Sequence, residues 1–554
     1  MQHACDLANI LKAFIGSNFL SIPFGFSHCG LLLGVVGMVC IAVLTAHCCL
    51  LLVTCKHKLL HHIIAAQEQH HTNLATTESD FMVKEFPGSD MNAAHDSNSP
   101  TFRHSSYRRL AKNIQYGDVA RTCLGYWGIV VVNTAIIITQ LGFCVNYIIF
   151  TSNAFSAFFP VYNCTVTADC ANHTVRVSPD CAESVTWRRW QDGDPDNGTN
   201  GDLTVSSNQS SSSDFEYSSG FDNVTGGVFA SPSSTETAST CGQLLKEVWS
   251  SAPDLQLMVM APTLVCILLV LVRNLRRLGL VSAVGNLALL AGALLVLGLL
   301  IASFQLSDSW VVSQVTGLPT FVSMTASALE GIGTVLPIEA SMAENRHNFP
   351  VFLLAGLTIV VVVDVGVSVL GYLSFGSSTA QIITLNLQAA SPPGVAVNAF
   401  LLVGVMLTFP LMAFPVVQLV EKTFFRNDKL CECEVKDPEQ LSLLKDQEAT
   451  NKACDQHHSK ASPWKRSLLR VVLVLLVAGL AVVLRNNFAY VAAFTGAVGS
   501  ITLAYTLPCI FHLQMCWSEL SVPVKVKDVV IIVTGLSFTI LSLFTTVQDL
   551  VTRN

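Results

Sequence analysis

Two short stretches, each followed by a proline, decide how this chain folds. They are residues 15–19, Ile-Gly-Ser-Asn-Phe, with Pro23 after them, and residues 327–333, Ser-Ala-Leu-Glu-Gly-Ile-Gly, with Pro337 after them. Both lie inside long apolar segments. Glycine and proline weaken a helix, and within a bilayer the backbone groups that they free must face protein or a water-filled cavity. We therefore expect two spanning helices that are each broken near the middle.

The composition around these stretches indicates a membrane protein. The chain has 554 residues, 51% hydrophobic and 12% charged, with a mean hydropathy of +0.52, whereas soluble domains carry about 25% charged residues. A spanning helix needs about 20 mostly apolar residues. About eleven segments meet this requirement: 6–27, 29–55, 126–152, 254–272, 278–303, 318–343, 351–375, 394–420, 467–485, 489–513 and 528–549. The predicted fold class is an all-α membrane protein.

These segments divide the chain into membrane parts and long loops. The first segment begins close to Met1 and contains Lys12, so we expect it to stay as a spanning helix and not to be removed as a signal peptide. The expected parts are 1–55 (helices 1 and 2), 56–125 (a cytosolic loop), 126–152 (helix 3), 153–253 (a luminal or extracellular loop), 254–421 (helices 4 to 8), 422–466 (a cytosolic loop) and 467–554 (helices 9 to 11).

The orientation follows from the positive charges in the connections. Lysine and arginine crowd 56–125 and 422–466, whereas 304–317 and 376–393 contain neither. Cytosolic connections carry the excess of these residues, which places the N-terminus in the cytosol. The loop 153–253 then faces the lumen or the exterior.

Modification signals in the loop 153–253 agree with this orientation. The loop holds five glycosylation sequons, at Asn163, Asn172, Asn197, Asn208 and Asn223. It also holds four of the 18 cysteines, Cys164, Cys170, Cys181 and Cys241. In an oxidising compartment these four could form two disulfides, with three possible pairings.

The two interrupted segments are the first and the sixth, five helices apart. Matched interruptions are typical of an inverted five-plus-five repeat that binds substrate at the broken midpoints. Free helix ends there could hold a carboxylate and an ammonium. The expected substrate-binding residues are Gly16, Ser17, Asn18, Glu330, Gly331, Ile332 and Gly333. The alternative is that the glycines only allow close helix packing.

The same stretches resemble a known family. Residues 9–17, Asn-Ile-Leu-Lys-Ala-Phe-Ile-Gly-Ser, followed by Pro23, resemble the opening helix of the amino acid/auxin permease superfamily. Residues 329–339, Leu-Glu-Gly-Ile-Gly-Thr-Val-Leu-Pro-Ile-Glu, resemble the sixth helix of its proton-coupled amino acid transporter branch. Residues 116–118, 139–144, 370–376 and 496–500 are also similar to that branch.

The resemblance implies a LeuT-like core with eleven helices, which carries small neutral amino acids such as glycine, alanine and proline together with a proton. A histidine in helix 2 serves the proton step in that branch, and His47 stands in the matching context. Glu330 and Asp364 are further candidates, since ionisable groups inside a bilayer are usually functional. Asn18 replaces a glycine of the family pattern, which leaves substrate choice open.

We therefore expect a transporter that is driven by a proton gradient without a cofactor, with an amino-acid sensor as the alternative. No helix offers His and Asp at the i, i+4 spacing of a buried metal site, and no catalytic motif of an enzyme is present. The net charge of −7 argues against binding to nucleic acid, which needs a basic surface.

Two short patterns in the cytosolic loops resemble sorting signals. Glu439, Leu443 and Leu444 fit an acidic dileucine signal, and residues 107–110 fit a tyrosine-based signal. These patterns favour lysosomes or endosomes over the plasma membrane and suggest sorting adaptors as partners.

Overall fold

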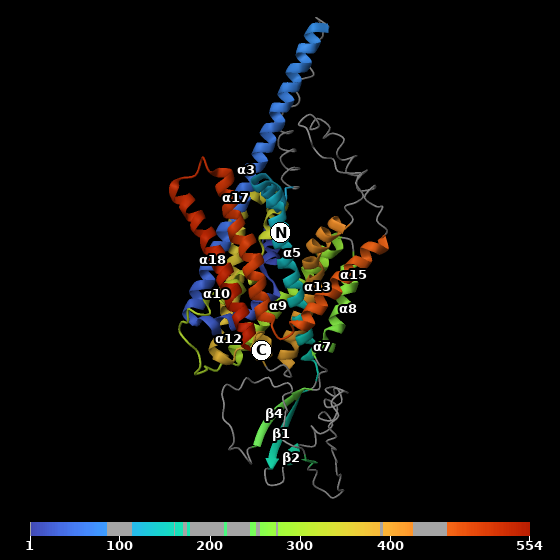
Figure 1. Cartoon of the computed structure of the whole chain (residues 1–554), viewed down its shortest axis with the longest axis vertical. Helices are drawn as coiled ribbons and strands as arrows, with labels where there is room; N and C mark the ends of the chain where they lie inside the picture. The colour runs from blue at the N-terminus through green and yellow to red at the C-terminus, as the bar shows by residue number, and fades with distance from the viewer. Residues whose placement is uncertain are drawn as a thin grey trace.

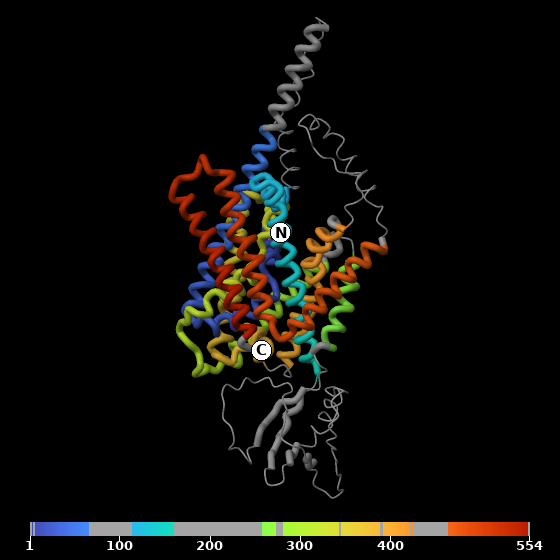
Figure 2. Tube along the Cα trace, viewed as in Figure 1, coloured from blue at the N-terminus to red at the C-terminus, as the bar shows by residue number. Residues whose placement is uncertain are grey.

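The structure is a computed structural model that describes residues 2–85, 114–159, 161–169, 174–177, 215–218, 244–250, 255–272, 275–387, 392–424 and 463–553. Figures 1 and 2 show its helices packed side by side in one bundle. Nine of the described helices are long and apolar enough to cross a bilayer, and a bent pair in the first segment raises the count to ten. The predicted all-α membrane fold is thus confirmed for the bundle.

The helices follow the predicted segments in order. Helix 1 consists of α1 (Gln2–Phe14), η1 (Ser17–Ser21) and α2 (Ile22–Cys29), and helix 6 of α10 (Leu318–Ala328) and α11 (Ile332–Ser341). Helix 10 consists of α16 (Phe488–Thr495), the π-helical turns η7 (Gly496–Ser500) and η8 (Thr502–Thr506), and α17 (Leu507–Cys516). The other elements of the bundle are α3 (Leu31–Glu85), α5 (Tyr116–Ser156), α7 (Leu255–Met258), α8 (Met260–Val270), α9 (Leu275–Ala302), η2 (Ala343–Asn348), α12 (Phe349–Phe375), η3 (Gly376–Ser378), η4 (Ile383–Leu385), α13 (Pro392–Phe424), α15 (Pro463–Val483) and α18 (Val522–Arg553).

Several helices differ in length from the prediction, α3 most of all. The helix α3 extends past its predicted end at residue 55, because a helix does not need apolar residues once it leaves the lipid. The range of α5 begins at Tyr116, before its predicted start at residue 126, but the helix is kinked at Gly125, whose φ is 62°. A capping box at Gln115 and Asp118 fixes the start of α5, where the Gln115 backbone N–H donates to the Asp118 carboxylate at 2.8 Å. The segment predicted at 254–272 contains the 11-residue helix α8, shorter than the other spans.

The loop 153–253 contains strands that were not predicted from the sequence. They are β1 (Val161–Asp169), β2 (Thr174–Val177), β3 (Phe215–Ser218) and β4 (Leu244–Ser250). They form an antiparallel sheet in the order β3-β2-β1-β4, of which Figure 1 labels β1, β2 and β4. The pairing of β1 with β4 joins the two ends of the loop.

The bundle is apolar outside and partly polar inside. Large apolar side chains on α18 are exposed, among them Val533, Leu536, Ile540 and Phe544. They recur at the spacing of one helix face, which therefore faces lipid. Buried polar residues, by contrast, gather on the inner helices 1, 3, 6 and 10. This distribution places the polar side chains that could bind a ligand within the bundle.

Glycines bring α9 and α13 into close contact. A Cβ added at Gly285 would lie 2.9 Å from the Gly404 carbonyl oxygen, and one at Gly404 would lie 2.9 Å from the Gly285 carbonyl oxygen. A Cβ at Gly292 would lie 2.5 Å from the Leu401 side chain. Small residues that let helix backbones approach are a common means of association in lipid. These glycines therefore serve packing.

This contact predicts a stability difference between two glycines of α9. Gly285→Val should lower the melting temperature in detergent, since overpacking costs about 1–3 kcal/mol. Gly298→Val is the matched control, because a Cβ at Gly298 would meet nothing within 4 Å. Thermal unfolding followed by fluorescence measures both. Equal melting temperatures for the two variants would contradict the packing role.

Candidate functional site

The first spanning helix is interrupted where the sequence predicts it. The α1 helix ends at Phe14 and η1 begins at Ser17, so Ile15 and Gly16 are non-helical. The two halves meet at an angle of 46°. Gly16 has an extended backbone, and a Cβ added to it would meet nothing within 4 Å. Packing therefore does not require this glycine, and open space lies beside it.

The sixth spanning helix is interrupted at residues 329–331, between α10 and α11. Its two glycines have different surroundings. A Cβ at Gly331 would lie 2.7 Å from the Phe14 ring and 2.9 Å from the Ala13 carbonyl oxygen, so this glycine lets the two breaks touch. A Cβ at Gly333 would meet nothing within 4 Å. The packing alternative thus holds for Gly331 and not for Gly16 or Gly333.

Three buried polar side chains hold the breaks in place. The Asn18 amide nitrogen donates to the Ser327 hydroxyl at 2.7 Å, which joins η1 to α10. The Asn146 amide nitrogen, on α5, donates to the Asn18 amide oxygen at 3.2 Å. Asn18 thus links helix 1 to helices 3 and 6. Asn146 was not predicted from the sequence, where it is one of three amide side chains in the span 126–152, with Asn133 and Gln140.

The buried polar atoms around the breaks have unused hydrogen-bonding capacity. Within the described residues, the Ser17 hydroxyl lacks a hydrogen-bond partner, and the Glu330 carboxylate and the Ser500 hydroxyl interact with each other while Glu330 Oε2 makes no well-formed hydrogen bond. Burying such groups without a partner is costly. The elements that carry Ser17 and Ser500, η1 and η7, both contact α10, which ends just before the helix-6 break. Their donors and acceptors suit a small ligand that carries both an ammonium and a carboxylate.

The π-helical part of helix 10 forms one wall of this region. A Cβ at Gly496 would collide with the Ser323 carbonyl oxygen, and one at Gly499 would collide with the Thr139 hydroxyl. These glycines let η7 press against α10 and α5. π-Helical turns are rare and frequently occur at functional sites. Residues 496–500, which resemble the family, therefore shape the site through their backbone.

The predicted proton-coupling residues do not all lie together. His47 lies on α3, with its Nε2 atom 2.7 Å from the Lys527 ammonium nitrogen. Asp364 lies on α12, where its buried Oδ2 atom has no partner among the described residues. Glu330 lies in the helix-6 break itself. Among the described residues, no direct hydrogen bond joins His47 or Asp364 to either break.

A second polar cluster surrounds Glu339 at the end of α11. The Glu339 carboxylate is fully buried and lies 2.7 Å from the Lys56 ammonium, 2.9 Å from the His57 ring and 2.9 Å from the Arg346 guanidinium. Lys56 also donates to the Leu336 carbonyl oxygen at 3.1 Å. Because removing one partner of a buried ion pair is strongly destabilising, this cluster clamps helix 6 to helix 2.

The clamp continues to helix 1. The Asn345 amide, on η2, donates to the Asp6 carboxylate at 3.0 Å. The η2 turn also carries Arg346, which contacts Glu339. Helices 1, 2 and 6 are thus joined at the end of the bundle where α1 begins. From the sequence, Glu339 could be placed in helix 6, but its partners could not be identified.

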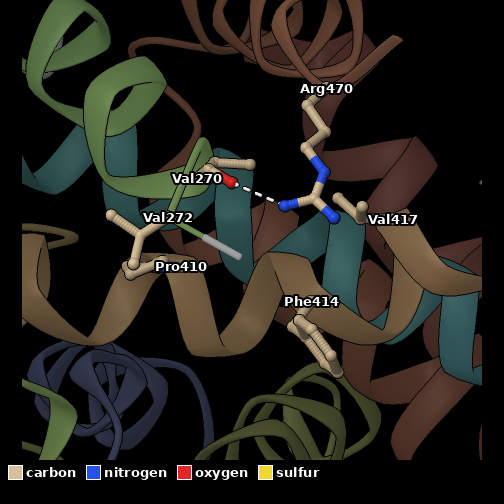
Figure 3. A pocket seen from close by; sticks show the side chains of 6 residues that line it. All are labelled: Val270, Val272, Pro410, Phe414, Val417 and Arg470. Carbon is tan, nitrogen blue, oxygen red and sulfur yellow. Dashed lines mark hydrogen bonds between the residues drawn. The ribbon is translucent and has the colours of Figure 1, made fainter. Parts of the chain in front are cut away.

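The small pocket in Figure 3 is separate from the breaks. It is lined by Val270, Val272, Pro410, Phe414, Val417 and Arg470. Arg470 donates to the Val270 carbonyl oxygen at 3.0 Å and pairs with Glu421 at 2.8 Å. It therefore caps the last turn of the short α8, whose carbonyls would otherwise lack partners. We assign this pocket a structural role.

Several predicted sites in the loops are not tested by the structure. Asn163 and Cys164 lie in strand β1. The other sequons and loop cysteines, and the sorting residues Glu439, Leu443 and Leu444, lie outside the described residues. Glycosylation, disulfides and sorting therefore stay predictions.

Comparisons with known proteins agree on a family. Amino acid transporter AVT3C of Arabidopsis thaliana is 25% identical over 95% of this chain and 86% of its own length. Vacuolar amino acid transporter 4 of Saccharomyces cerevisiae is 26% identical over 46% of this chain and 35% of its own length. Amino acid transporter ANT1 of Arabidopsis thaliana is 30% identical over 44% of this chain and 52% of its own length. The alignments with the latter two thus span about half or less of those relatives.

The family comparison covers most of the membrane part. Residues 6–71, 102–177 and 235–548 match the family described as "Transmembrane amino acid transporter protein". The matched residues include both breaks and the π-helical turns. The family and the relatives are transporters and not enzymes, as predicted. This chain is therefore a multi-pass membrane protein that belongs to the transmembrane amino acid transporter family.

Proposed function

We propose that this protein carries small neutral amino acids, of the glycine, alanine and proline type, across a membrane together with protons. The observation that carries the proposal is the meeting of the two breaks. Asn18 joins them at 2.7 Å through Ser327, and an added Cβ would meet nothing within 4 Å at half-buried Gly16 or at exposed Gly333. Bulky side chains are absent at these two positions, which suits a small substrate.

The chemistry of the breaks supports a zwitterionic substrate. The Glu330 carboxylate, whose Oε2 atom makes no well-formed hydrogen bond, can accept from the substrate ammonium. The backbone N–H groups at the start of α11, beginning at Ile332, can donate to the substrate carboxylate, because a helix N-terminus favours an anion. Broken helices at the same depth are the recurring device of transporters with inverted repeats, and we propose that repeat here.

We further propose that the carrier alternates between two openings. The Glu339 clamp closes the bundle where helices 1, 2 and 6 meet, and its release would open that end to the site. A relative from Drosophila melanogaster, 29% identical over 33% of this chain and 39% of its own length, is named "Proton-coupled amino acid transporter-like protein pathetic". That name supports the coupling to protons, for which His47 is our first candidate.

The membrane and the orientation are part of the proposal. The charge distribution favours a cytosolic N-terminus, with the loop 153–253 in the lumen or outside, glycosylated and disulfide-bonded. The vacuolar relatives and the sorting patterns favour the lysosomal or endosomal membrane over the plasma membrane. Protons would then drive amino acids from the acidic lumen into the cytosol.

The first prediction concerns transport itself. Proteoliposomes that contain the protein should take up labelled glycine, alanine or proline faster with an inward proton gradient than without it. A protonophore should abolish the difference. Gradient-independent uptake would make the protein a facilitator. Binding without uptake, measured by equilibrium dialysis, would identify an amino-acid sensor instead.

The second prediction concerns His47. His47→Ala should remove the stimulation of uptake by acid and leave exchange of internal for external amino acid largely intact, since exchange needs no net proton movement. His62→Ala, an exposed histidine on the same helix, is the matched control and should behave as the wild type. Full acid stimulation in His47→Ala would exclude this residue as the proton site.

The third prediction concerns Asn18. Asn18→Ala should raise the KM for amino acid about thirtyfold, because it removes the hydrogen bonds with Ser327 and Asn146, each of which contributes about 1 kcal/mol. The ratio of uptake with and without the gradient should not change. Ser21→Ala is the control in the same element, as its hydroxyl donates only along η1, to the Asn18 carbonyl oxygen at 2.8 Å. An unchanged KM in Asn18→Ala would show that the link between the breaks does not shape the site.

A further inference from the structure

A line of four ionisable side chains joins helices 2, 10 and 11 beside the proposed proton site. The Lys527 ammonium lies 2.7 Å from His47 Nε2 and 3.1 Å from Asp528 Oδ1. The other carboxylate oxygen, Asp528 Oδ2, lies 2.6 Å from His512 Nδ1. Asp528 is fully buried, and the His512 side chain is 8% exposed. Of these four residues, only His47 was predicted from the sequence.

The geometry fixes the state of His47. An ammonium has only donors, so a charged Lys527 donates to His47 Nε2 and that atom must carry its lone pair. His47 is therefore neutral in this arrangement. A proton can reach Nε2 only after Lys527 moves away. The Lys527 side chain is 38% exposed and thus has room to move, whereas Asp528 is held by His512.

We propose that Lys527 and Asp528 are positioning residues that set the pH at which His47 takes up its proton, and that Lys527 is displaced when it does so. This inference rests on the proposed role of His47 in proton-coupled transport. Lys527 opposes a second positive charge on His47, while Asp528 attracts either cation. The buried carboxylate keeps one positive charge in its vicinity in both states, which lowers the cost of the exchange.

Among the described residues, the other polar side chains near His47 are thiols and hydroxyls. The buried thiols of Cys48 on α3 and Cys509 on α17 lie against each other. The Tyr505 phenol on η8 bonds the Thr45 hydroxyl at 3.0 Å. The charged neighbours that face His47 from the helices packed around it are Lys527 and Asp528 on α18 and, when protonated, His512 on α17.

The same network gives a route to the substrate site. His512 lies on α17, which continues the π-helical turns η7 and η8 of helix 10. Lys527 and Asp528 tie α18 to both α3 and α17. When Lys527 leaves His47, the hydrogen bond between helices 2 and 11 is lost, while the Asp528–His512 contact between helices 11 and 10 stays. Proton uptake thus breaks the contact of helix 2 with helix 11, while helix 11 stays bound to helix 10, which forms one wall of the site.

The test is the pH dependence of uptake in proteoliposomes for two variants with opposite expected shifts. Lys527→Gln removes the opposing charge, so the midpoint of acid activation should move to higher pH, by about one unit. Asp528→Asn removes the attracting charge, so the midpoint should move to lower pH by a similar amount. Lys525→Gln is the control, because that ammonium lies over the Trp517 ring at 4.3 Å and its loss should not shift the midpoint.

The outcomes separate this inference from the proposed function. Acid-activated uptake in the wild type with unshifted midpoints in both variants, or with shifts in the same direction, would overturn the inference and leave the transporter intact. A wild type whose uptake ignores pH would overturn the proposed proton coupling. Should Asp528→Asn fail to fold, the partly exposed Lys527 still decides the question: a shift to higher pH in Lys527→Gln supports the inference and no shift refutes it.

Discussion

The bilayer forbids a backbone amide without a hydrogen-bond partner, and this constraint governs the whole centre of the molecule. Two helices are interrupted, at residues 15–16 and 329–331, and neither interruption could face lipid. Instead, each break lies against the other, with Gly331 on the Phe14 ring. The amides of Asn18 and Asn146 then complete the contact with helices 6 and 3. The candidate site that we propose depends on these two interruptions being packed together.

The sequence predicted those features that depend on local chemistry. Apolar length located the spans, and glycine and proline located both breaks. The same logic failed where a residue's role depends on a distant partner. Glu339 was visible as an acid in helix 6, but Lys56 lies 283 positions away. Lys527 lies 480 positions from His47. No periodicity relates such pairs, and only the packing of helices brings them together.

The glycines at the breaks also show that the role of a residue can depend on a neighbouring helix that the sequence does not reveal. Gly16, Gly331 and Gly333 were all predicted to bind substrate, and the sequence alone could not separate them. In the structure Gly331 is required for helix contact, whereas Gly16 and Gly333 border open space. The difference lies in what a Cβ would meet, and that depends on a neighbouring helix. The segment predicted at 254–272 lies close to the combined range of α7 and α8, Leu255–Val270.

The short α8 also changes the lipid around the protein. Together α7 and α8 run from Leu255 to Val270, which at 1.5 Å per residue is roughly 24 Å, against about 30 Å of hydrocarbon. Exposed Leu264 and Leu268 show that this helix meets acyl chains directly. A helix shorter than the hydrocarbon thins the bilayer beside it. Beside α8 the bilayer would therefore be thinner, which would bring headgroups and water towards the Arg470–Glu421 pair at its end.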